Sequence, residues 1–311
     1  MQLIRLQYPF QKTDYPAQVL AIGDFDGVHL GHRKVIGQAV NTAREAGVAS
    51  AIMTFDPHPR EVLGQQKYEC LLTPFPHKLQ LLAGLDVDYL YVVSFDETFA
   101  AISPEQFINE ILYSMNLHTV VIGFDFTFGH RGKGNAELLR NAKSLSFSVQ
   151  VVEPHLFATE KVSSTRIRQL LAEGDVASIP ALLGRHYDLI GVVRHGDGRG
   201  RKIGFPTANL ELDGSYIFPK LGVYAVYASV NGSRYPAVVN IGVRPTFLVE
   251  PVVANVEVHL LDFDGDLYND TMSIELVQFL RTEQKFNGVD QLIAQIHRDI
   301  EQTRQIFSVE S

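Results

Sequence analysis

Residues 18–32 read QVLAIGDFDGVHLGH, and this stretch joins a short apolar run to a segment with helical spacing. The first six of these residues predict a strand, and the apolar spacing of Arg33–Ala46 predicts a helix directly after it. Three glycines in the turn allow a ligand to approach the backbone closely, and the N-terminus of the following helix favours an anion. We therefore expect an anion-binding turn between the first predicted strand and the first predicted helix.

The same alternation continues to about residue 184. Further short apolar runs predict strands at Ala49–Phe55, Tyr89–Ser94, Thr119–Gly123 and Ser146–Val152. Helical spacing predicts helices at Pro76–Ala83, Ser103–Met115, Ala136–Ser144, Ser164–Leu171 and Val176–Leu183. Strands that alternate with helices at this spacing are typical of βαβ units, so we expect an α/β domain with a parallel sheet over residues 1–184.

From residue 185 onward the pattern changes to strand-like runs separated by turns. Five runs predict strands, at Tyr187–Val193, Gly222–Val230, Tyr235–Ile241, Val252–Leu261 and Met272–Leu280. Asn231-Gly232 and Asp264-Gly265 are typical of tight hairpin turns, because these residue types tolerate positive φ. Apolar residues at steps of three and four between positions 288 and 306 predict an amphipathic helix. We expect an antiparallel β-barrel closed by one terminal helix over residues 185–311.

The composition is that of an ordinary globular protein, since 46% of the 311 residues are hydrophobic and 20% are charged. It excludes a disordered chain, a collagen-like fibre and a disulfide-stapled miniprotein, and the length predicts two domains that can each bury a core. With 27 Lys and Arg against 35 Asp and Glu, the net charge of −8 gives no electrostatic footprint for nucleic acid or an anionic membrane. We expect neither as a partner, and any phosphate binding must come from a local site.

The single cysteine, Cys70, cannot form an intrachain disulfide, and we expect it to be a small buried core thiol. Residues 1–18 include Arg5, Lys12 and Asp14 and lack the apolar segment of a secretory signal. No apolar run approaches the roughly 18 residues that span a bilayer. We therefore expect a protein of a reducing, cytoplasmic compartment.

His29 and His32 lie three residues apart in the first turn and can present both imidazoles to one phosphate. A histidine at such a turn, taken alone, is more often a helix cap or a surface residue. Neither GxGxxG nor GxxxxGK[ST] occurs at this turn, which argues against the two commonest nucleotide-binding loops. Residues 23–32 as a whole resemble the HxGH signature of the α/β nucleotidyltransferases, in the longer form found in the FAD synthetase family.

Three further segments carry the same resemblance: TFDPHP at 54–59, GFDFTFG at 123–129 and SSTRIR at 163–168. Each lies at the end of a predicted strand or at a helix start, where the ligands of an open parallel sheet collect. The resemblance implies a Rossmann-like fold and attack of the FMN phosphate on the α-phosphorus of ATP. The expected products are FAD and pyrophosphate, with Mg²⁺ on the phosphate oxygens.

The resemblance also implies site residues in the first domain. The implied ATP-binding residues are Gly23, Asp24, Phe25, His29, His32, Ser163, Ser164, Thr165 and Arg168, with the two histidines binding charge on the α-phosphate. The implied flavin-binding residues are Phe55, Pro57, Asp125, Phe126 and Phe128. Helix capping stays open as an alternative for residues 163–165, a solvated charge for Arg168 and core packing for Phe126 and Phe128. The contact of Asp125 is left open, and His58 is expected only to cap or orient its loop.

Residues 196–210 read GDGRGRKIGFPTANL and form the densest motif in the chain. Four glycines and three cations are typical of a loop that wraps a polyphosphate with its backbone amides, although a mobile surface loop has the same composition. Thr207 and Asn209 place a hydroxyl and a carboxamide oxygen on one predicted strand face, where both can ligate a hard cation. The expected phosphate-loop residues are Gly196, Gly198, Arg201, Gly204 and Pro206.

The second half resembles riboflavin kinase nearly from end to end. Further matching segments are GVY at 222–224, NIG at 240–242, PTF at 245–247, EVH at 257–259, DF at 262–263, LR at 280–281 and KF at 285–286. The resemblance implies phosphorylation of riboflavin by ATP to give FMN and ADP, with Glu257 as the base for the ribityl 5′-hydroxyl and Arg281 on the flavin or phosphate. An exposed strand face is the alternative for Glu257, and a surface ion pair for Arg281. Lys202 stands where the family more often has a small polar residue.

The whole chain is similar to the bacterial bifunctional riboflavin kinases/FAD synthetases, so we expect both steps in one protein, with ATP–Mg²⁺ in each. A single adenylyltransferase for another phosphorylated metabolite, with a regulatory second domain, is one alternative; Thr207, Asn209 and Glu257 argue against it. A flavin-sensing or flavin-storage module is the other, and His29 and His32 argue against that.

Overall fold

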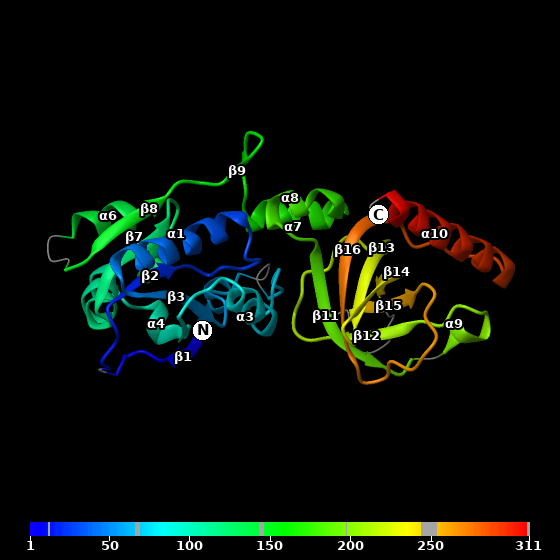
Figure 1. Cartoon of the computed structure of the whole chain (residues 1–311), viewed down its shortest axis with the longest axis horizontal. Coiled ribbons are helices and arrows are strands. Elements are labelled where there is room, and N and C mark those ends of the chain that lie inside the picture. Colours follow the sequence, from blue (N-terminus) through cyan, green and yellow to red (C-terminus); the bar gives the residue numbers. More distant parts are fainter. Residues whose placement is uncertain (12, 66–68, 143–145, 197, 244–253, 310–311) are drawn as a thin grey trace. The chain divides into compact units, whose positions relative to one another are not determined.

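The structure is a computed structural model that describes residues 1–311 except 12, 66–68, 143–145, 197, 244–253 and 310–311 (Figure 1). The chain divides into two compact units, residues 1–164 and residues 165–311. Among the described residues, no helix is long and apolar enough to cross a membrane.

The first unit is built on a parallel sheet of six strands. These are β1 (Gln2–Leu6), β2 (Gln18–Ile22), β3 (Ala49–Asp56), β4 (Tyr89–Ser94), β5 (Leu117–Gly123) and β8 (Ser148–Val152). They lie in the order β1-β4-β3-β2-β5-β8, and every neighbouring pair is parallel. The predicted parallel α/β fold is confirmed. The edge strand β1 was not predicted, because its side chains are half-buried or exposed and it lacks a continuous apolar run.

Helices cover both faces of this sheet (Figure 1). On one face lie α1 (Leu30–Ala46) and α3 (Phe75–Ala83); on the other lie α4 (Glu97–Ala100), α5 (Pro104–Gln106), η2 (Phe107–Ile111), η3 (Leu112–Met115) and α6 (Ala136–Asn141). All five residues of the central strand β2 are therefore buried. The single helix predicted over Ser103–Met115 is wrong in detail, because one α-helical turn there passes into a π-helix and then a 3₁₀ turn.

The order of the strands fixes where a ligand can bind in the first unit. The chain runs from β2 outward to β3 and β4, and then returns to the other side of β2 to form β5 and β8. Ligands of such sheets bind at the carboxyl ends of the strands where the order reverses, here between β2 and β5. The segment that leads from β2 into the first turn of α1 holds the two histidines, and the segment after β5 holds Asp125, Phe126 and Phe128.

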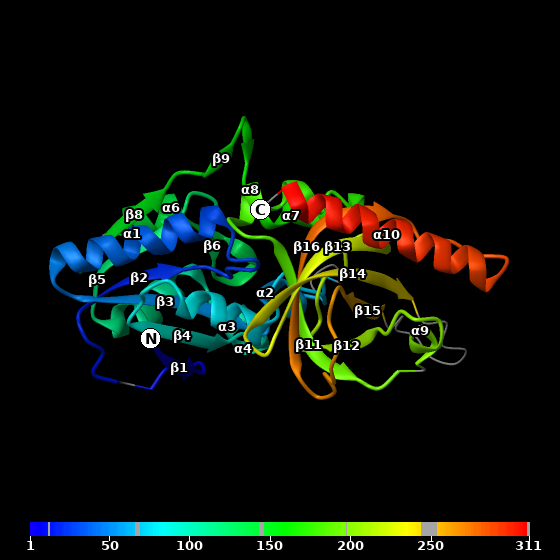
Figure 2. The ribbon, with the colours of Figure 1, turned by 45° about the vertical axis from the view of Figure 1, so that its right-hand side comes forward.

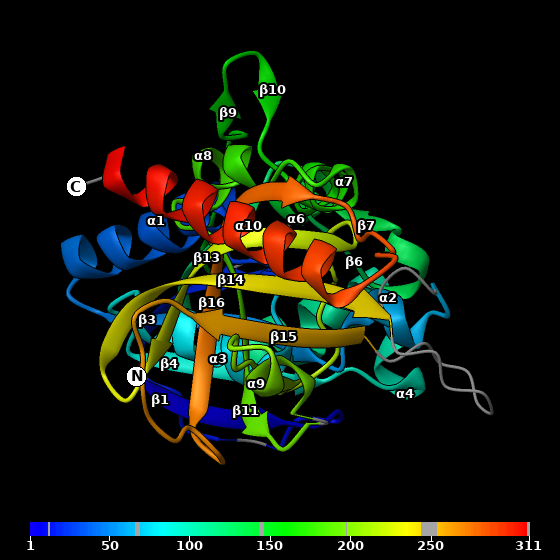
Figure 3. The same cartoon turned by 90° about the vertical axis from the view of Figure 1, so that its right-hand side faces the viewer.

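Three small elements border this edge of the sheet. The short helix α2 (Pro59–Val62) follows β3, and a hairpin of β6 (Thr127–Phe128) and β7 (Gly134–Asn135), with the turn η4 (His130–Gly132), follows β5. A second hairpin, β9 (Leu156–Phe157) and β10 (Glu160–Lys161), projects from the first unit (Figure 3). Cys70 lies in the loop between α2 and α3 and is exposed, so the prediction of a core thiol is wrong. Leu72, two residues further along the chain, is fully buried, so this leucine and not the thiol takes the core position there.

The second unit is a closed antiparallel barrel. Its strands are β11 (Tyr187–Arg194), β12 (Ala208–Leu212), β13 (Gly222–Val230), β14 (Ser233–Val243), β15 (Ala254–Leu260) and β16 (Thr271–Arg281), in the order β11-β12-β15-β14-β13-β16. The predicted barrel is confirmed, with six strands rather than five. β12 overlaps the end of the 196–210 motif, and its polar residues Asn209 and Glu211 interrupt the apolar pattern. It was therefore expected only as a strand face at Thr207 and Asn209 and was not among the five predicted runs.

One of the two predicted hairpins is confirmed and one is wrong. Asn231 and Gly232 have φ of 50° and 75° and connect the paired strands β13 and β14, with Val230 opposite Ser233. The strands on either side of Asp264-Gly265, β15 and β16, are not neighbours in the barrel. That segment is therefore a crossing loop, which composition alone does not distinguish from a hairpin.

In the second unit, helices come before the first barrel strand and after the last one in the sequence. The terminal helix α10 (Val289–Val309) lies along the barrel over β13 and β14 (Figures 2 and 3), as expected for the predicted closing helix. The segment α7 (Ser164–Glu173), η5 (Val176–Ser178) and α8 (Pro180–Leu183) precedes the barrel, and the Lys220 amide donates to the Leu171 carbonyl oxygen at 2.8 Å. Residues 165–184 thus pack with the barrel, and the boundary between the two activities at 184/185 stays a prediction.

Candidate active sites

The turn after β2 brings the two histidines face to face. His29 is the N-cap of α1, where its Nδ1 accepts the backbone N–H of His32 at 3.2 Å. The two rings stack with their centroids 3.5 Å apart and their planes at 16°. The turn needs its glycine at position 23, because a Cβ there would lie 2.8 Å from the ring of Phe25. The structure therefore brings together Gly23, Phe25 and the histidine pair, as predicted.

Both histidines are neutral in the folded chain. Burial, together with neighbouring His32, lowers the pKa of His29 to about 2. Burial also lowers the pKa of His32, although the carboxylates of Asp24, Asp26 and Asp125 act in the opposite direction. Because Nδ1 of His29 accepts a hydrogen bond, its proton sits on Nε2, where it can be donated to an anion. Nδ1 of His32 is buried and has no hydrogen-bond partner among the residues that the structure describes.

Asp24 lies beside these rings and is held by a third histidine. Nε2 of His58 is 3.4 Å from the Asp24 carboxylate, and Nδ1 of His58 accepts the backbone N–H of Arg60 at the start of α2. Burial raises the pKa of Asp24, but His58, His32 and Lys78 together outweigh it and lower that pKa. His58 thus caps its helix, as predicted, and also orients Asp24, which the sequence did not indicate.

Ser164 ties the start of α7 to the same turn. Its hydroxyl donates to the Asp26 carbonyl oxygen at 3.0 Å, and the Asp26 carboxylate accepts the backbone N–H of Thr73 at 3.1 Å. Ser164 is the last residue of the first unit, whereas Thr165 and Arg168 belong to the second. The phosphate-binding roles of Ser163, Ser164, Thr165 and Arg168 stay predictions.

The aromatic residues predicted to bind flavin differ in exposure. Phe128 is 6% exposed and packs 5.0 Å from the ring of Phe107, so it belongs to the core, which was its alternative. Phe126 stacks on Phe128 with centroids 5.7 Å apart and is half-buried, so it is better placed to meet a ligand. Phe55 is buried at the end of β3, and Pro57 beyond it is exposed. Their contacts with flavin stay predictions.

Asp125 is paired with a lysine from the projecting hairpin. Nζ of Lys161 lies 2.6 Å from the Asp125 carboxylate and 4.5 Å from the centroid of the Phe124 ring. Lys161 also acts to lower the pKa of His29, and Asp125 acts to raise that of His32. These electrostatic couplings place the hairpin and the turn after β5 within reach of the histidine pair.

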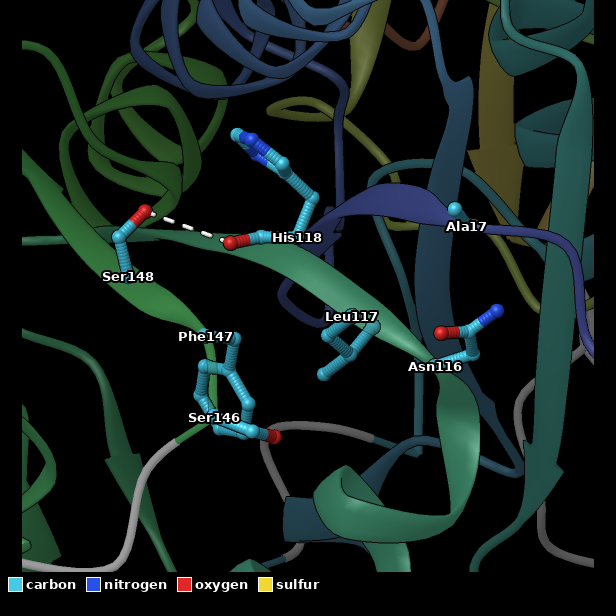
Figure 4. A pocket seen from close by; sticks show the side chains of 7 residues that line it. All are labelled: Ala17, Asn116, Leu117, His118, Ser146, Phe147 and Ser148. Carbon is cyan, nitrogen blue, oxygen red and sulfur yellow. Dashed lines mark hydrogen bonds between the residues drawn. The ribbon is translucent and has the colours of Figure 1, made fainter.

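A surface pocket of about 650 Å³ lies at the opposite edge of the sheet (Figure 4). Its lining residues are Ala17, Asn116, Leu117, His118, Ser146, Phe147 and Ser148. They lie at or just before the amino ends of β2, β5 and β8, and Ser148 donates to the His118 carbonyl oxygen at 3.4 Å. No predicted site residue lines this pocket, and its position is opposite to where α/β sheets bind ligands.

In the barrel, Glu257 lies on β15 between two asparagines. Its strand partners are Asn209 of β12 and Asn240 of β14. Val256 and Val258 on either side are buried, so Glu257 points to the outer face of the barrel, where it is half-buried. Nδ2 of Asn255, two residues earlier on the same face, donates to Oε1 of Glu257 at 2.7 Å and holds the carboxylate in place.

The glycine-rich motif passes directly over Asn209. A Cβ on Gly196 would overlap the Asn209 carboxamide, so a larger residue there would have to displace that side chain. Arg199–Lys202 forms one short helical turn, α9, rather than an open loop, and Gly198 and Gly204 on either side have φ of 64° and 89°. The structure therefore brings the motif to the strand position beside Glu257.

The remaining predicted residues of this site lie around the same strands. The Pro206 carbonyl oxygen is 2.8 Å from Nδ1 of His259, and Arg201 and Thr207 are exposed. Thr207 directly precedes β12 and Asn209 lies within it, so their shared strand face stays a prediction. The matching segment 245–247 lies outside the described residues.

Arg281 is engaged in an ion pair. Its guanidinium donates to both carboxylate oxygens of Asp299 on α10 at 2.8 to 3.0 Å. The two side chains are 17% and 4% exposed, so this is a largely buried pair rather than the surface pair considered above. A role of Arg281 toward flavin or phosphate stays a prediction.

The described residues contain no cluster of three or more His, Cys, Asp or Glu that could hold a metal ion. Mg²⁺ needs no such cluster in a nucleotide site, because it binds one or two protein oxygens together with substrate phosphates and water. The Thr207 hydroxyl and the Asn209 carboxamide are hard oxygen donors next to the glycine-rich motif. The donor set in the barrel therefore fits Mg²⁺.

One feature of the first site was missed by the sequence reasoning. Lys78 of α3 is buried at the carboxyl ends of β2 and β3, with its ammonium hydrogen-bonded to Asp24, Thr54 and Phe55. The available signal was a lysine four residues before the buried Leu82, on the apolar face of a predicted helix.

Comparison with known proteins finds a family for each half of the chain. A family model described as FAD synthetase matches residues 11–166, and one described as riboflavin kinase matches residues 183–307. The proteins named bifunctional riboflavin kinase/FMN adenylyltransferase from Bacillus subtilis, Listeria monocytogenes and Escherichia coli are 44%, 41% and 37% identical to the chain, each over 99% of both sequences.

A crystal structure described as a macrolide-efflux protein from Streptococcus pneumoniae has the same fold, with a TM-score of 0.87 and 33% identity over 98% of this chain and 99% of that one. The two matched models follow one another along the sequence as the two sites do. The chain belongs to the family of bifunctional riboflavin kinases/FMN adenylyltransferases.

Proposed function

We propose that the chain converts riboflavin to FAD in two steps, each with its own ATP. The second unit phosphorylates riboflavin to FMN with release of ADP, and the first unit transfers AMP from ATP to FMN with release of pyrophosphate. The observation that carries this proposal is the presence in one chain of two separately built sites, the histidine pair after β2 and Glu257 beside Asn209. Full-length similarity to proteins named for both activities supports it.

In the first unit, an FMN phosphate oxygen attacks the α-phosphorus of ATP, and the bond from that phosphorus to the bridging oxygen breaks. Such a transfer needs alignment and charge stabilisation more than covalent chemistry. His29 and His32 would donate hydrogen bonds to the α-phosphate oxygens as negative charge develops, from the N-terminus of a helix that favours anions. Gly23, Asp24 and Phe25 would shape the turn, and Ser163 and Ser164 would help to hold the outer phosphates.

In the second unit, Glu257 would accept the proton of the ribityl 5′-hydroxyl as its oxygen attacks the γ-phosphorus of ATP. The bond to the bridging oxygen breaks, and ADP leaves with the released electron pair. The Asn255 amide keeps the acceptor oxygens of Glu257 oriented. Thr207 and Asn209 would hold Mg²⁺, which neutralises charge on the ATP phosphates when bound. A role in the cytoplasm stays a prediction.

Separate assays test the two activities. Riboflavin with ATP–Mg²⁺ should give FMN and ADP, and FMN with ATP–Mg²⁺ should give FAD and pyrophosphate, both measured by chromatography. FMN formation without any FAD from added FMN would remove the assignment of the first unit. Formation of neither product would overturn the proposal.

A further inference from the structure

Lys78 is a cation that the reaction scheme above does not use. It is 3% exposed, and its ammonium lies 3.1 Å from the Asp24 carbonyl oxygen, 3.3 Å from the Phe55 carbonyl oxygen and 3.4 Å from the Thr54 hydroxyl. A lysine ammonium has three N–H donors, so these three acceptors account for all of them. A buried charge is costly unless it is paired and hydrogen-bonded, and here every hydrogen bond goes to one edge of the sheet.

The acceptors belong to two strand ends that lead into two different ligand loops. Asp24 follows β2 and opens the turn with the histidine pair, whereas Phe55 at the end of β3 leads into the segment with the predicted flavin contact Pro57. The Thr54 hydroxyl adds a second connection, since it donates to the same Asp24 carbonyl oxygen at 3.0 Å. Lys78 therefore hydrogen-bonds to both strand ends, the one that leads into the nucleotide loop and the one that leads into the flavin loop.

Charge as well as geometry connects Lys78 to the site. The carboxylates of Asp24, Asp26 and Asp56 oppose the effect of burial, which lowers the pKa of Lys78. In return, Lys78 helps to lower the pKa of Asp24, together with His58 from α2 and His32 from α1. The ammonium thus favours the ionised form of the carboxylate that lies beside the histidine pair.

We propose that Lys78 is a positioning residue for adenylyl transfer, which holds the nucleotide loop and the flavin loop in register without touching either substrate. The proposal rests on the proposed function of the first unit. Because all three of its N–H donors are used at the ends of β2 and β3, Lys78 acts on the reaction through Asp24 and through the backbone of these two strands.

The test compares Lys78→Met with Arg44→Met. Both remove one positive charge from the first unit, but Arg44 lies at the exposed end of α1, 3.9 Å from the Asp86 carboxylate. Loss of a supporting contact behind a reactive site typically costs about 10- to 100-fold. We expect Lys78→Met to lower kcat/KM for FMN adenylylation by that factor, with KM raised for both ATP and FMN. Arg44→Met should change neither, and far-UV circular dichroism and thermal unfolding curves that match the wild type report intact folding of the first unit in both variants.

The pH profile separates positioning from simple packing. Without the ammonium, the pKa of Asp24 rises, so the fall of adenylylation on the acid side should begin at a higher pH in Lys78→Met than in the wild type. An unchanged kcat/KM, or a loss that is equal at every pH, would overturn the proposal. If Lys78→Met does not fold, Thr54→Val removes one of the three acceptors, and it should show a smaller loss with the same direction of pH change. Wild-type protein that makes no FAD from FMN would instead refute the proposed function.

Discussion

Glu257→Gln should separate the two activities of the chain. The substitution keeps the size of the side chain and leaves Oε1 able to accept the 2.7 Å hydrogen bond from Asn255. It removes only the ability to take a proton from the ribityl hydroxyl. Strand pairing with Asn209 and Asn240 depends on the backbone and is unaffected.

The expected loss of kcat depends on how much basicity the site keeps without the Glu257 carboxylate. A positioned base contributes about 10²- to 10⁴-fold, which corresponds to roughly 2.7 to 5.4 kcal/mol of activation free energy. Glu257 is half-buried on the outer face of the barrel, so water can reach the site and replace part of the lost basicity. We therefore expect the lower half of that range, a fall of about 10²- to 10³-fold in kcat for riboflavin phosphorylation. KM for riboflavin should change little, because the base acts mainly in the transition state.

The assay follows FMN and FAD by chromatography, with riboflavin or FMN as the flavin substrate. Glu275→Gln is the matched control, since Glu275 lies on β16 of the same barrel in an ion pair with Arg234 at 2.7 Å. The control should keep both activities, and Glu257→Gln should still make FAD from added FMN at a near wild-type rate. Normal riboflavin phosphorylation by Glu257→Gln would refute the assigned base, and loss of FAD synthesis from FMN would refute the independence of the two sites.

Three further predictions concern the first site and the stability of the second unit. Replacing both His29 and His32 with Ala should lower the rate of FMN adenylylation at least about a hundredfold, since one lost stabilising contact costs on the order of 3 kcal/mol. Riboflavin phosphorylation should be unchanged. Steady-state rates of both reactions measure this, and an equal loss of both activities would contradict it. Burial and His32 lower the pKa of His29 to about 2 in the folded chain, whereas its ordinary pKa of about 6.5 applies in the unfolded chain. Below about pH 6.5 the unfolded chain therefore binds a proton that the folded chain excludes. The free energy of unfolding consequently falls as the pH falls. His29→Asn keeps a residue type that can cap the helix. Between about pH 6.5 and 5, the Tm of this variant should therefore fall less than the Tm of the wild type, and parallel plots of Tm against pH would refute this. Asp299→Ala leaves the largely buried Arg281 without its ion-pair partner and should destabilise the chain by about 3 to 5 kcal/mol in urea unfolding, whereas loss of the exposed Arg304 side chain should leave the unfolding curve nearly unchanged.

Sequence patterns predicted the elements that carry strong periodicity. The apolar runs of β2 to β5 and the alternation of strands with helices were enough for a parallel sheet, because strands buried on both faces are continuously apolar. The strand β1 escaped because it is a half-exposed edge. The strand β12 was missing from the five apolar runs because it alternates polar residues, although Asn209 had been expected on a strand face. The π-helix at Phe107–Ile111 escaped because its i to i+5 hydrogen bonds change little in the spacing of apolar residues.

The features of the candidate sites could be predicted only where they depend on local sequence. Motifs confined to one turn could be read directly, as with the histidine pair, because the spacing of two residues in a helix start determines how their rings meet. Contacts between distant segments could not be read. The pair of Asp24 with His58 and the hydrogen bonds of Lys78 depend on how β2, β3 and α3 pack, and no local pattern encodes that packing.

The most direct test of two-step FAD synthesis uses riboflavin and ATP–Mg²⁺ labelled with different phosphorus isotopes at the α and γ positions. The kinase step places a γ-phosphorus in FMN, and the adenylyl transfer then adds an α-phosphorus from a second ATP. FAD purified by chromatography should therefore contain the two labels in equal amounts, and FMN should carry only the γ label. FAD without the γ label, or FMN as the sole labelled flavin, would contradict the account.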